Sequence, residues 1–156
     1  MRVRRAFLLL AFGLALWSAV LAHEALPVSA PSAAPQKKWI LIELDMKRLT
    51  LYQGTTVLKR YPIASGAWST PSPIGVFTVI GRFKTEMSGF GTRFLRLNVP
   101  WGVYGIHGTN RPDSIGANAS HGCIRLRVAD AEALYAMVPN GTRVYLEGGP
   151  YGPLGD

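Results

Sequence analysis

The pattern that decides the fold lies in residues 39–63, WILIELDMKRLTLYQGTTVLKRYPI. Its apolar and β-branched residues fall into short runs at 39–45, 49–52 and 56–63, separated by a basic connection and a Gln-Gly pair. Runs of this composition between turn residues are typical of antiparallel strands joined by tight turns. The stretch therefore predicts a three-stranded meander at the start of a folded domain.

The chain after this meander continues as short strands with one helical segment near its end. Apolar runs predict further strands at residues 75–80, 94–97, 103–106 and 142–146. Residues 82–92, of mixed polarity with two glycines, are predicted to be a mobile loop, and residues 129–137 have apolar side chains at helical spacing. The spacing indicates a mainly β domain with one late helix, an antiparallel open barrel or curled β-sandwich.

The first 22 residues have the composition of a secretory signal. Arg2, Arg4 and Arg5 precede an apolar run at residues 6–22, which ends on the small residue Ala22. A basic start, an apolar middle and a small-residue exit predict a cleaved signal peptide. The run is long for a signal core and short for a spanning helix, so an uncleaved N-terminal anchor is the alternative. Both interpretations place the rest of the chain outside the cytoplasm, in the periplasm or cell wall.

The segments on either side of the predicted domain have low complexity. Residues 23–38, HEALPVSAPSAAPQKK, are rich in Pro and Ala and predict an extended linker. Residues 148–156, GGPYGPLGD, predict a flexible tail. Residues 39–147 are left as one folded domain, a length that can bury a real core.

The net charge of +8 suits a polyanionic partner, such as a bacterial wall or an anionic membrane surface, although solubility alone also explains it. Nucleic acid is not expected, because the basic residues are scattered rather than grouped in a stripe with aromatics. The sequence contains no GxGxxG, Walker, HExxH or paired CxxC motif, so no cofactor is expected.

Cys123 is the single cysteine of the chain, so it forms no internal disulfide. A lone cysteine in an exported protein indicates either intermolecular pairing or a working thiol. The alternative is a buried cysteine that serves as a small apolar side chain.

The neighbours of this cysteine favour a working thiol. Residues 105–127 read GIHGTNRPDSIGANASHGCIRLR and contain two of the three histidines. A nucleophilic thiol needs a base, for which His107 and His121 are candidates, or a cation such as Arg125 to lower its pKa. If the segment is a strand, His121, Cys123 and Arg125 share one face.

The remaining motif residues have both a functional and a structural interpretation. Gly122 leaves the backbone beside the thiol bare, so that its N–H can help to form an oxyanion hole. Ser120 and Gly108 are also explained as turn residues alone.

Zinc is an alternative use of the same side chains, because His107, His121 and Cys123 are soft or borderline ligands. Asp113 would then have to supply a fourth ligand from a loop. A metal site is therefore not expected.

Two motifs together resemble the signature of the L,D-transpeptidase (YkuD-like) family. They are IHGTN at residues 106–110 and SHGCIRL at residues 120–126. The family signature is a His-Gly, a spacer, and Ser/Thr-His-Gly-Cys with an Arg or Asn shortly after it. The likeness extends over residues 39–146 and includes TPSPIGVF at 70–77. A departure is Val128, where members often have Asn, so that Asp130 is expected to cap the late helix.

The resemblance implies the L,D-transpeptidase catalytic fold and a cysteine acyltransferase mechanism. Cys123 attacks the stem amide between the L-centre of the diamino acid and the terminal D-residue of a tetrapeptide. His107 serves as base and then as acid, oriented by a backbone carbonyl near Gly108. The N–H groups of Gly122 and Cys123 hold the oxyanion, and Arg125 and His121 steady the substrate or the loop.

The resemblance also implies the partners of this reaction. The acyl-enzyme passes to the amine of another peptidoglycan stem and gives a 3→3 cross-link. A lipoprotein lysine, a free D-amino acid or water are other acceptors, and carbapenem-type inhibitors acylate the thiol. A wall cysteine peptidase is the alternative within the same chemistry, and a non-catalytic wall-binding module is the alternative outside it.

Overall fold

The computed structural model describes residues 36–149, without the side chains of residues 87 and 88. The predicted signal segment, nearly all of the predicted linker and most of the predicted tail lie outside these residues. These three assignments stay predictions. Among the described residues, no helix is long and apolar enough to cross a membrane.

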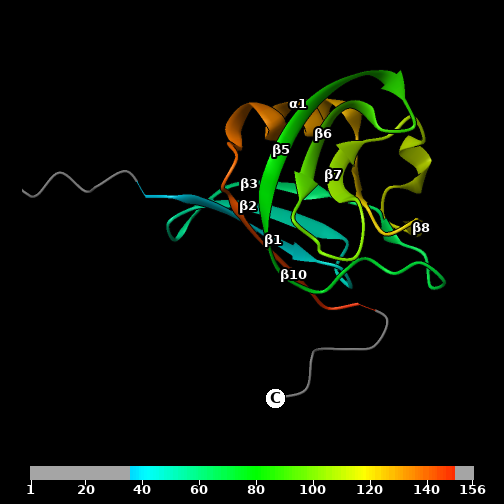
Figure 1. Cartoon of the computed structure of the whole chain (residues 1–156), viewed down its shortest axis with the longest axis horizontal. Helices are drawn as coiled ribbons and strands as arrows, with labels where there is room; N and C mark the ends of the chain where they lie inside the picture. The colour runs from blue at the N-terminus through cyan, green and yellow to red at the C-terminus, as the bar shows by residue number, and fades with distance from the viewer. Residues whose placement is uncertain (1–35, 150–156) are drawn as a thin grey trace, which may run out of the picture. The chain divides into compact units, whose positions relative to one another are not determined.

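Within residues 36–149 the chain forms mostly strands, with one α-helix (Figure 1). The elements in chain order are β1 (Lys38–Glu43), β2 (Arg48–Gln53), β3 (Thr56–Pro62), β4 (Ser65–Gly66), β5 (Gly75–Ser88), β6 (Gly91–Leu97), β7 (Tyr104–Gly108), the 3-10 helix η1 (Pro112–Ser114), β8 (Asn118–Ser120), β9 (Ile124–Leu126), α1 (Val128–Met137) and β10 (Arg143–Glu147). In this part of the chain, eight strands form one sheet in the order β3-β2-β1-β10-β5-β6-β7-β9, and β4 pairs with β8. The predicted mainly β fold with one late helix is confirmed.

The predicted meander is present as β1, β2 and β3, which pair antiparallel in that order. Ile40 and Ile42 of β1 lie opposite Leu51 and Leu49 of β2, and all four side chains are fully buried. These pairs supply the N-terminal part of the core. Strand β1 begins at Lys38, because the backbone there already pairs with the end of β2, so the predicted linker runs one residue too far.

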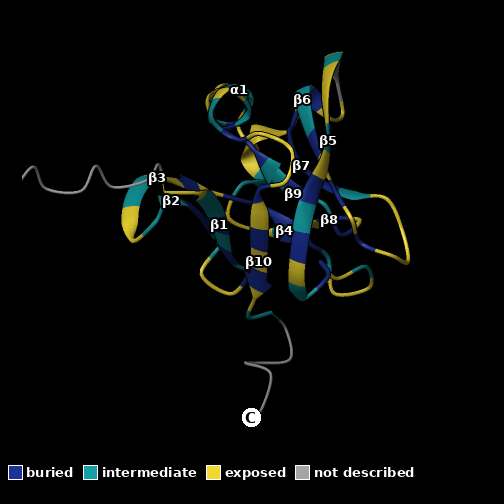
Figure 2. Ribbon diagram, turned by 60° about the vertical axis from the view of Figure 1, so that its left-hand side comes forward, coloured by how far each residue is buried: buried dark blue, intermediate teal, exposed yellow. Residues whose placement is uncertain are grey.

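Strand β10 lies between β1 and β5, although it is the last described strand in the chain. It runs parallel to β1 and antiparallel to β5. Figure 2 shows buried and exposed residues alternating along it, as expected for a strand with one face on the core. The sheet is therefore mixed, while most of its pairings remain antiparallel as expected.

Strand β5 joins the two halves of the sheet. Its first residues, 75–78, pair with β10, and residues 79–88 pair with β6. The prediction of a mobile loop at residues 82–92 is wrong, because Arg82, Phe83 and Lys84 are paired strand residues and only a short turn separates β5 from β6. Both faces of this hairpin end are largely exposed, so the segment lacks the alternation that marks a strand in the sequence.

The sheet curls but does not close. Strands β3 and β9 stand at its two ends and do not pair with each other. A backbone bridge from Ala64 to Arg125 ties β9 to the loop that follows β3. The class predicted, an open barrel or curled β-sandwich, fits this curled sheet, which is not a closed barrel.

Helix α1 packs against β6 and β7 and buries Ala131 and Leu134. Its N-cap residue is Arg127, which makes no side-chain cap hydrogen bond. The prediction that Asp130 caps the helix is therefore wrong. Asp130 lies within the first turn, where a carboxylate favours the positive end of the helix dipole instead.

Candidate active site

Strands β7 and β9 bring the two sequence motifs to one place. They are adjacent and parallel, with His107 in register with Arg125, so both side chains stand on the same face. Ile106 and Ile124, the preceding register pair, are buried in the core on the other face. A cavity of about 330 Å³ is lined by Gly89, Phe90, Val103, His107, Ser120, His121, Cys123 and Arg125.

His107 is buried, and its ring is fixed from several sides. Its Nδ1 forms a hydrogen bond with the carbonyl oxygen of Gly108. Phe94 stacks on the imidazole with 5.7 Å between ring centroids and 11° between planes. Phe90 meets it edge-on at 5.0 Å. A carbonyl only accepts, so Nδ1 carries the proton and Nε2 is the ring nitrogen that can act as a base.

Burial lowers the pKa of His107 below its ordinary value. The carbonyl of Gly108 opposes this shift, and the positive charge of Arg125 adds to it. The imidazole is therefore neutral near neutral pH, which is the form a general base requires.

Burial raises the pKa of the Cys123 thiol, against the backbone N–H of Gly105 and the charge of Arg125, which lower it. Its Sγ lies 4.0 Å from the carbonyl oxygen of Val103. Both shifts favour the uncharged forms, so that near neutral pH Cys123 is a thiol and His107 a neutral imidazole.

The turn before the cysteine is held by Ser120 and Gly122. The Ser120 hydroxyl donates to the carbonyl of Cys123 and accepts from the N–H of Gly122 at 3.0 Å. Gly122 has φ of +109°, and a Cβ there would lie 2.6 Å from Cε1 of Tyr104. Ser120 therefore shapes the turn. The expectation that the Gly122 N–H faces a substrate oxygen does not hold in this structure, because Ser120 occupies it.

The N–H of Cys123 makes no hydrogen bond to any residue in the described range 36–149, so it is available as a donor to a bound group. The loop after β4 also contacts this turn. The N–H of Ala67 and the hydroxyl of Thr70 both donate to the Ser120 carbonyl, at 2.8 and 3.0 Å. The sequence TPSPIG thus begins at the turn that precedes Cys123.

His121 is exposed at the rim of the cavity, whereas Arg125 is half-buried within it. The expected strand through His121, Cys123 and Arg125 begins only at Ile124, because the backbone at Gly122 is not extended. All three side chains nevertheless line the cavity.

Sequence reasoning missed Phe90 and Phe94, whose rings contact the imidazole of His107. Phe94 is the register partner of His107 on β6, so a correct pairing of the two strands would have found it. Phe90 was hidden in the segment wrongly predicted as a mobile loop.

Metal ligands are not gathered here. Within residues 36–149, no group of three or more His, Cys, Asp or Glu side chains could hold a metal ion. Asp113, which the zinc alternative needs, does not line the cavity.

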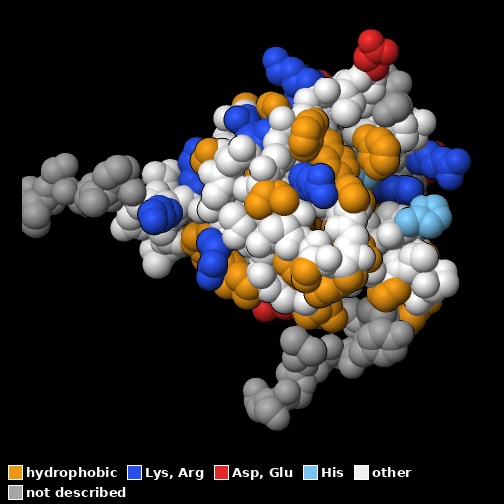
Figure 3. All heavy atoms as spheres, viewed as in Figure 1, with side chains coloured by type: hydrophobic (Ala, Val, Ile, Leu, Met, Phe, Trp, Pro, Cys, Tyr) orange, Lys and Arg blue, Asp and Glu red, His pale blue; other side chains and the backbone are white. Residues whose placement is uncertain are grey.

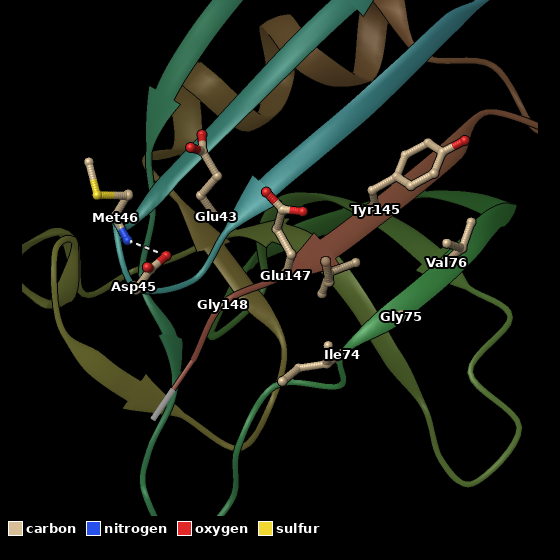
Figure 4. Close-up of a pocket in the computed structure, with 10 residues that line it drawn as sticks. Glu43, Asp45, Met46, Ile74, Gly75, Val76, Tyr145, Glu147 and Gly148 are labelled. Carbon is tan, nitrogen blue, oxygen red and sulfur yellow. Dashed lines mark hydrogen bonds between the residues drawn. The ribbon is translucent and has the colours of Figure 1, made fainter. Parts of the chain in front are cut away.

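A second cavity, of about 530 Å³, lies where β1 and β10 end and β5 begins (Figure 4). It is lined in part by the carboxylates of Glu43, Asp45 and Glu147. The cavity at Cys123 has no carboxylate among its lining residues.

Lys and Arg side chains are scattered over the face of the molecule that Figure 3 shows, rather than gathered in a stripe.

The model of the L,D-transpeptidase catalytic domain (YkuD) matches residues 37–146. The chain belongs to this family. It is 45% identical over 105 residues to the putative L,D-transpeptidase YkuD of Bacillus subtilis, a match that covers 67% of this chain and 63% of that protein. The chain thus spans less than two thirds of that relative.

Solved structures of the family share the fold. An L,D-transpeptidase from Xylanimonas cellulosilytica is 27% identical, with a TM-score of 0.60 over 73% of this chain and 62% of that one. The avibactam carbamoyl enzyme of Ldtfm is 25% identical, with a TM-score of 0.63 over 73% of this chain and 50% of that one.

Proposed function

We propose that the protein is an exported peptidoglycan L,D-transpeptidase with Cys123 as its nucleophile and His107 as its base. Family membership supports the class of activity. The observation that carries the residue assignment is the hydrogen bond between His107 Nδ1 and the Gly108 carbonyl, at a cavity that Cys123 also lines. This bond leaves Nε2 as the proton acceptor in the manner of a catalytic triad.

In the first half-reaction, His107 Nε2 takes the thiol proton and Sγ attacks the carbonyl carbon of the stem amide. The Cys123 N–H stabilises the oxyanion that forms. The C–N bond then breaks, and His107 returns its proton to the departing D-amino acid. The product is a thioester between Cys123 and the shortened stem.

In the second half-reaction, an acceptor amine attacks the thioester carbonyl while His107 removes its proton. The C–S bond breaks, and the proton passes to the sulfur. A second stem gives a 3→3 cross-link, and a lipoprotein lysine or a free D-amino acid gives the corresponding amide. Water gives only a trimmed stem, which is the outcome of a peptidase.

The part of this proposal that concerns export rests on the sequence alone. It rests on the signal pattern of residues 1–22 and on the net charge of +8, which suits the anionic wall and membrane surface. Cleavage of the signal and retention as an anchor lead to the same substrate.

The test is incubation of the protein with a disaccharide-tetrapeptide, followed by mass spectrometry of the products and of the intact protein. We expect a cross-linked dimer and a thioester on the peptide that contains Cys123. Trimmed monomer without dimer in the presence of acceptor amines would favour the peptidase. Neither product nor thioester would favour a non-catalytic module.

A further inference from the structure

The side chain that the proposed chemistry leaves unexplained is that of Arg125. Its backbone is fixed on β9, where its N–H and its carbonyl each form a 2.9 Å hydrogen bond with Ala64. Its neighbours on the strand, Ile124 and Leu126, are buried in the core. Arg125 therefore projects from the opposite face, beside His107 and into the cavity.

The guanidinium group of Arg125 has no partner among the residues that the structure describes. Its Nε is enclosed and makes no hydrogen bond, and no ion pair involves this side chain. The titratable groups that line the cavity with it are His107, His121 and Cys123, and no carboxylate lies among the lining residues. A partly buried, unpaired cation is costly unless an anion completes it.

We infer that Arg125 binds the carboxylate of the terminal D-residue of the donor stem. The inference rests on the proposed function, and it deepens it by naming the group that selects the donor. In a tetrapeptide, this carboxylate belongs to the same residue as the departing amide nitrogen. A thiol placed to attack that amide is then two residues from a guanidinium placed to receive the carboxylate. Arginine binds a carboxylate through two parallel hydrogen bonds, which fixes orientation as well as charge.

This assignment explains how the protein would select donor stems by their length and terminal charge. One additional residue moves the carboxylate away by about 3.3–3.6 Å, beyond the reach of the same pair of hydrogen bonds. A terminal carboxamide keeps the length but loses the charge. Arg125 thus selects a stem in which the terminal carboxylate lies one residue beyond the scissile amide carbonyl.

Binding of the carboxylate also acts on the base. Arg125 contributes to the lowered pKa of His107 in the free protein. A bound carboxylate offsets that charge, so the imidazole becomes more basic once the donor is in place. Donor recognition and proton removal are therefore coupled through one side chain.

The experiment compares two donors, a disaccharide-tetrapeptide with a free terminal carboxylate and the same compound with a terminal carboxamide. The rate of thioester formation is measured by intact-mass spectrometry for the wild type, Arg125→Gln, Arg125→Lys and Arg127→Gln. Arg127 is a matched control, because it is an exposed arginine two positions away that does not line the cavity.

We expect the wild type and Arg127→Gln to prefer the carboxylate donor by about 10–100-fold, the range of a hydrogen bond to a charged group. Arg125→Gln should lose this preference by slowing only with the carboxylate donor, and Arg125→Lys should retain part of it. Equal slowing of both donors by Arg125→Gln would assign Arg125 a structural role and overturn the inference. So would a wild type that accepts both donors alike.

The stability of each variant is followed by thermal unfolding. If Arg125→Gln does not fold, the wild type and Arg125→Lys are compared with the two donors. This comparison still tests whether Arg125 binds the donor carboxylate. Absence of a thioester with either donor in the wild type would sink the proposed function itself, and with it the inference.

Discussion

His107 and Arg125 are register partners on adjacent parallel strands, so an imidazole and a positive charge lie side by side on one face of the sheet. Phe94 flanks the imidazole from the strand on the other side. The row Phe94–His107–Arg125 crosses three strands and keeps the imidazole buried, oriented and neutral. Cys123 lies in the turn directly before β9.

Replacement of the nucleophile is the simplest test of the site. Cys123→Ser should abolish turnover and leave the fold intact, because a hydroxyl near neutral pH is a far weaker nucleophile than a thiolate. Product formation by mass spectrometry and thermal unfolding check the two parts. Retained activity would exclude Cys123 as the nucleophile.

The two histidines of the motif should differ in importance. His107→Ala is expected to lower kcat/KM by about 10²–10⁴-fold, as for loss of a general base. His121→Ala should cost less, because His121 is exposed at the rim. Steady-state kinetics of both variants decides the assignment, and equal or reversed losses would mean that the roles are exchanged.

Covalent inhibition tests the site as a whole. A carbapenem should form a one-to-one adduct on the peptide that contains Cys123, because its strained lactam carbonyl takes the place of the scissile amide. The adduct should be absent in Cys123→Ala and form much more slowly in His107→Ala, as measured by intact mass. Folded wild-type protein that stays unmodified over hours would contradict the proposed function.

The buried pair should also shape stability against pH. Below 6.5, the ordinary pKa of histidine, the unfolded chain binds a proton that folded His107 refuses, so stability should fall as the pH drops. Above 9.0, the ordinary pKa of cysteine, the unfolded chain releases a proton that folded Cys123 keeps, so stability should fall as the pH rises.

Urea unfolding between about pH 4 and pH 10 measures these slopes. Relative to the wild type, Cys123→Ala should have a shallower alkaline decline and His107→Ala a shallower acid decline. Variant curves that are merely displaced, with unchanged slopes, would show that neither group is linked to folding.

The turn before the nucleophile should be sensitive to a single methyl group. Gly122→Ala would place a Cβ 2.6 Å from Tyr104 on a backbone with φ of +109°. We expect a loss of stability of about 1–3 kcal/mol and a larger loss of activity, since the turn that carries the thiol must shift.

Gly116→Ala is the matched control for this substitution. Gly116 also has a positive φ, +97°, but a Cβ there meets nothing within 4 Å. The control therefore measures backbone strain alone. Similar activity in both variants would show that the packing of Gly122 against Tyr104 is unimportant.

The sequence predicted the elements that depend on a local pattern of residues. The apolar runs that contain Ile40, Ile42, Leu49 and Leu51 are separated by turn residues, and the motifs around His107 and Cys123 have a specific spacing. The features that the sequence did not predict depend on pairing between segments that are distant in the chain. Strand β10 lies parallel to β1 across about one hundred residues of sequence, which no local signal encodes.

The site was incompletely predicted for a related reason. The hydroxyl of Ser120 binds the Gly122 N–H, and this choice among several possible partners appears only when the turn is folded. Phe83 and Lys84 form a strand on the exposed end of a hairpin, where no buried face imposes a period of two. Phe90 lies at the turn of that hairpin, so its contact with His107 was not predicted either.

The position of β10 has a consequence for how the molecule is assembled. Without this strand, β3-β2-β1 and β5-β6-β7-β9 are separate ladders that share no backbone hydrogen bond in the eight-stranded order of the described residues. The sheet becomes continuous only after residues 143–147 have been synthesised. Such non-local closure is slow. The complete sheet would therefore form late, after Cys123 has already been synthesised.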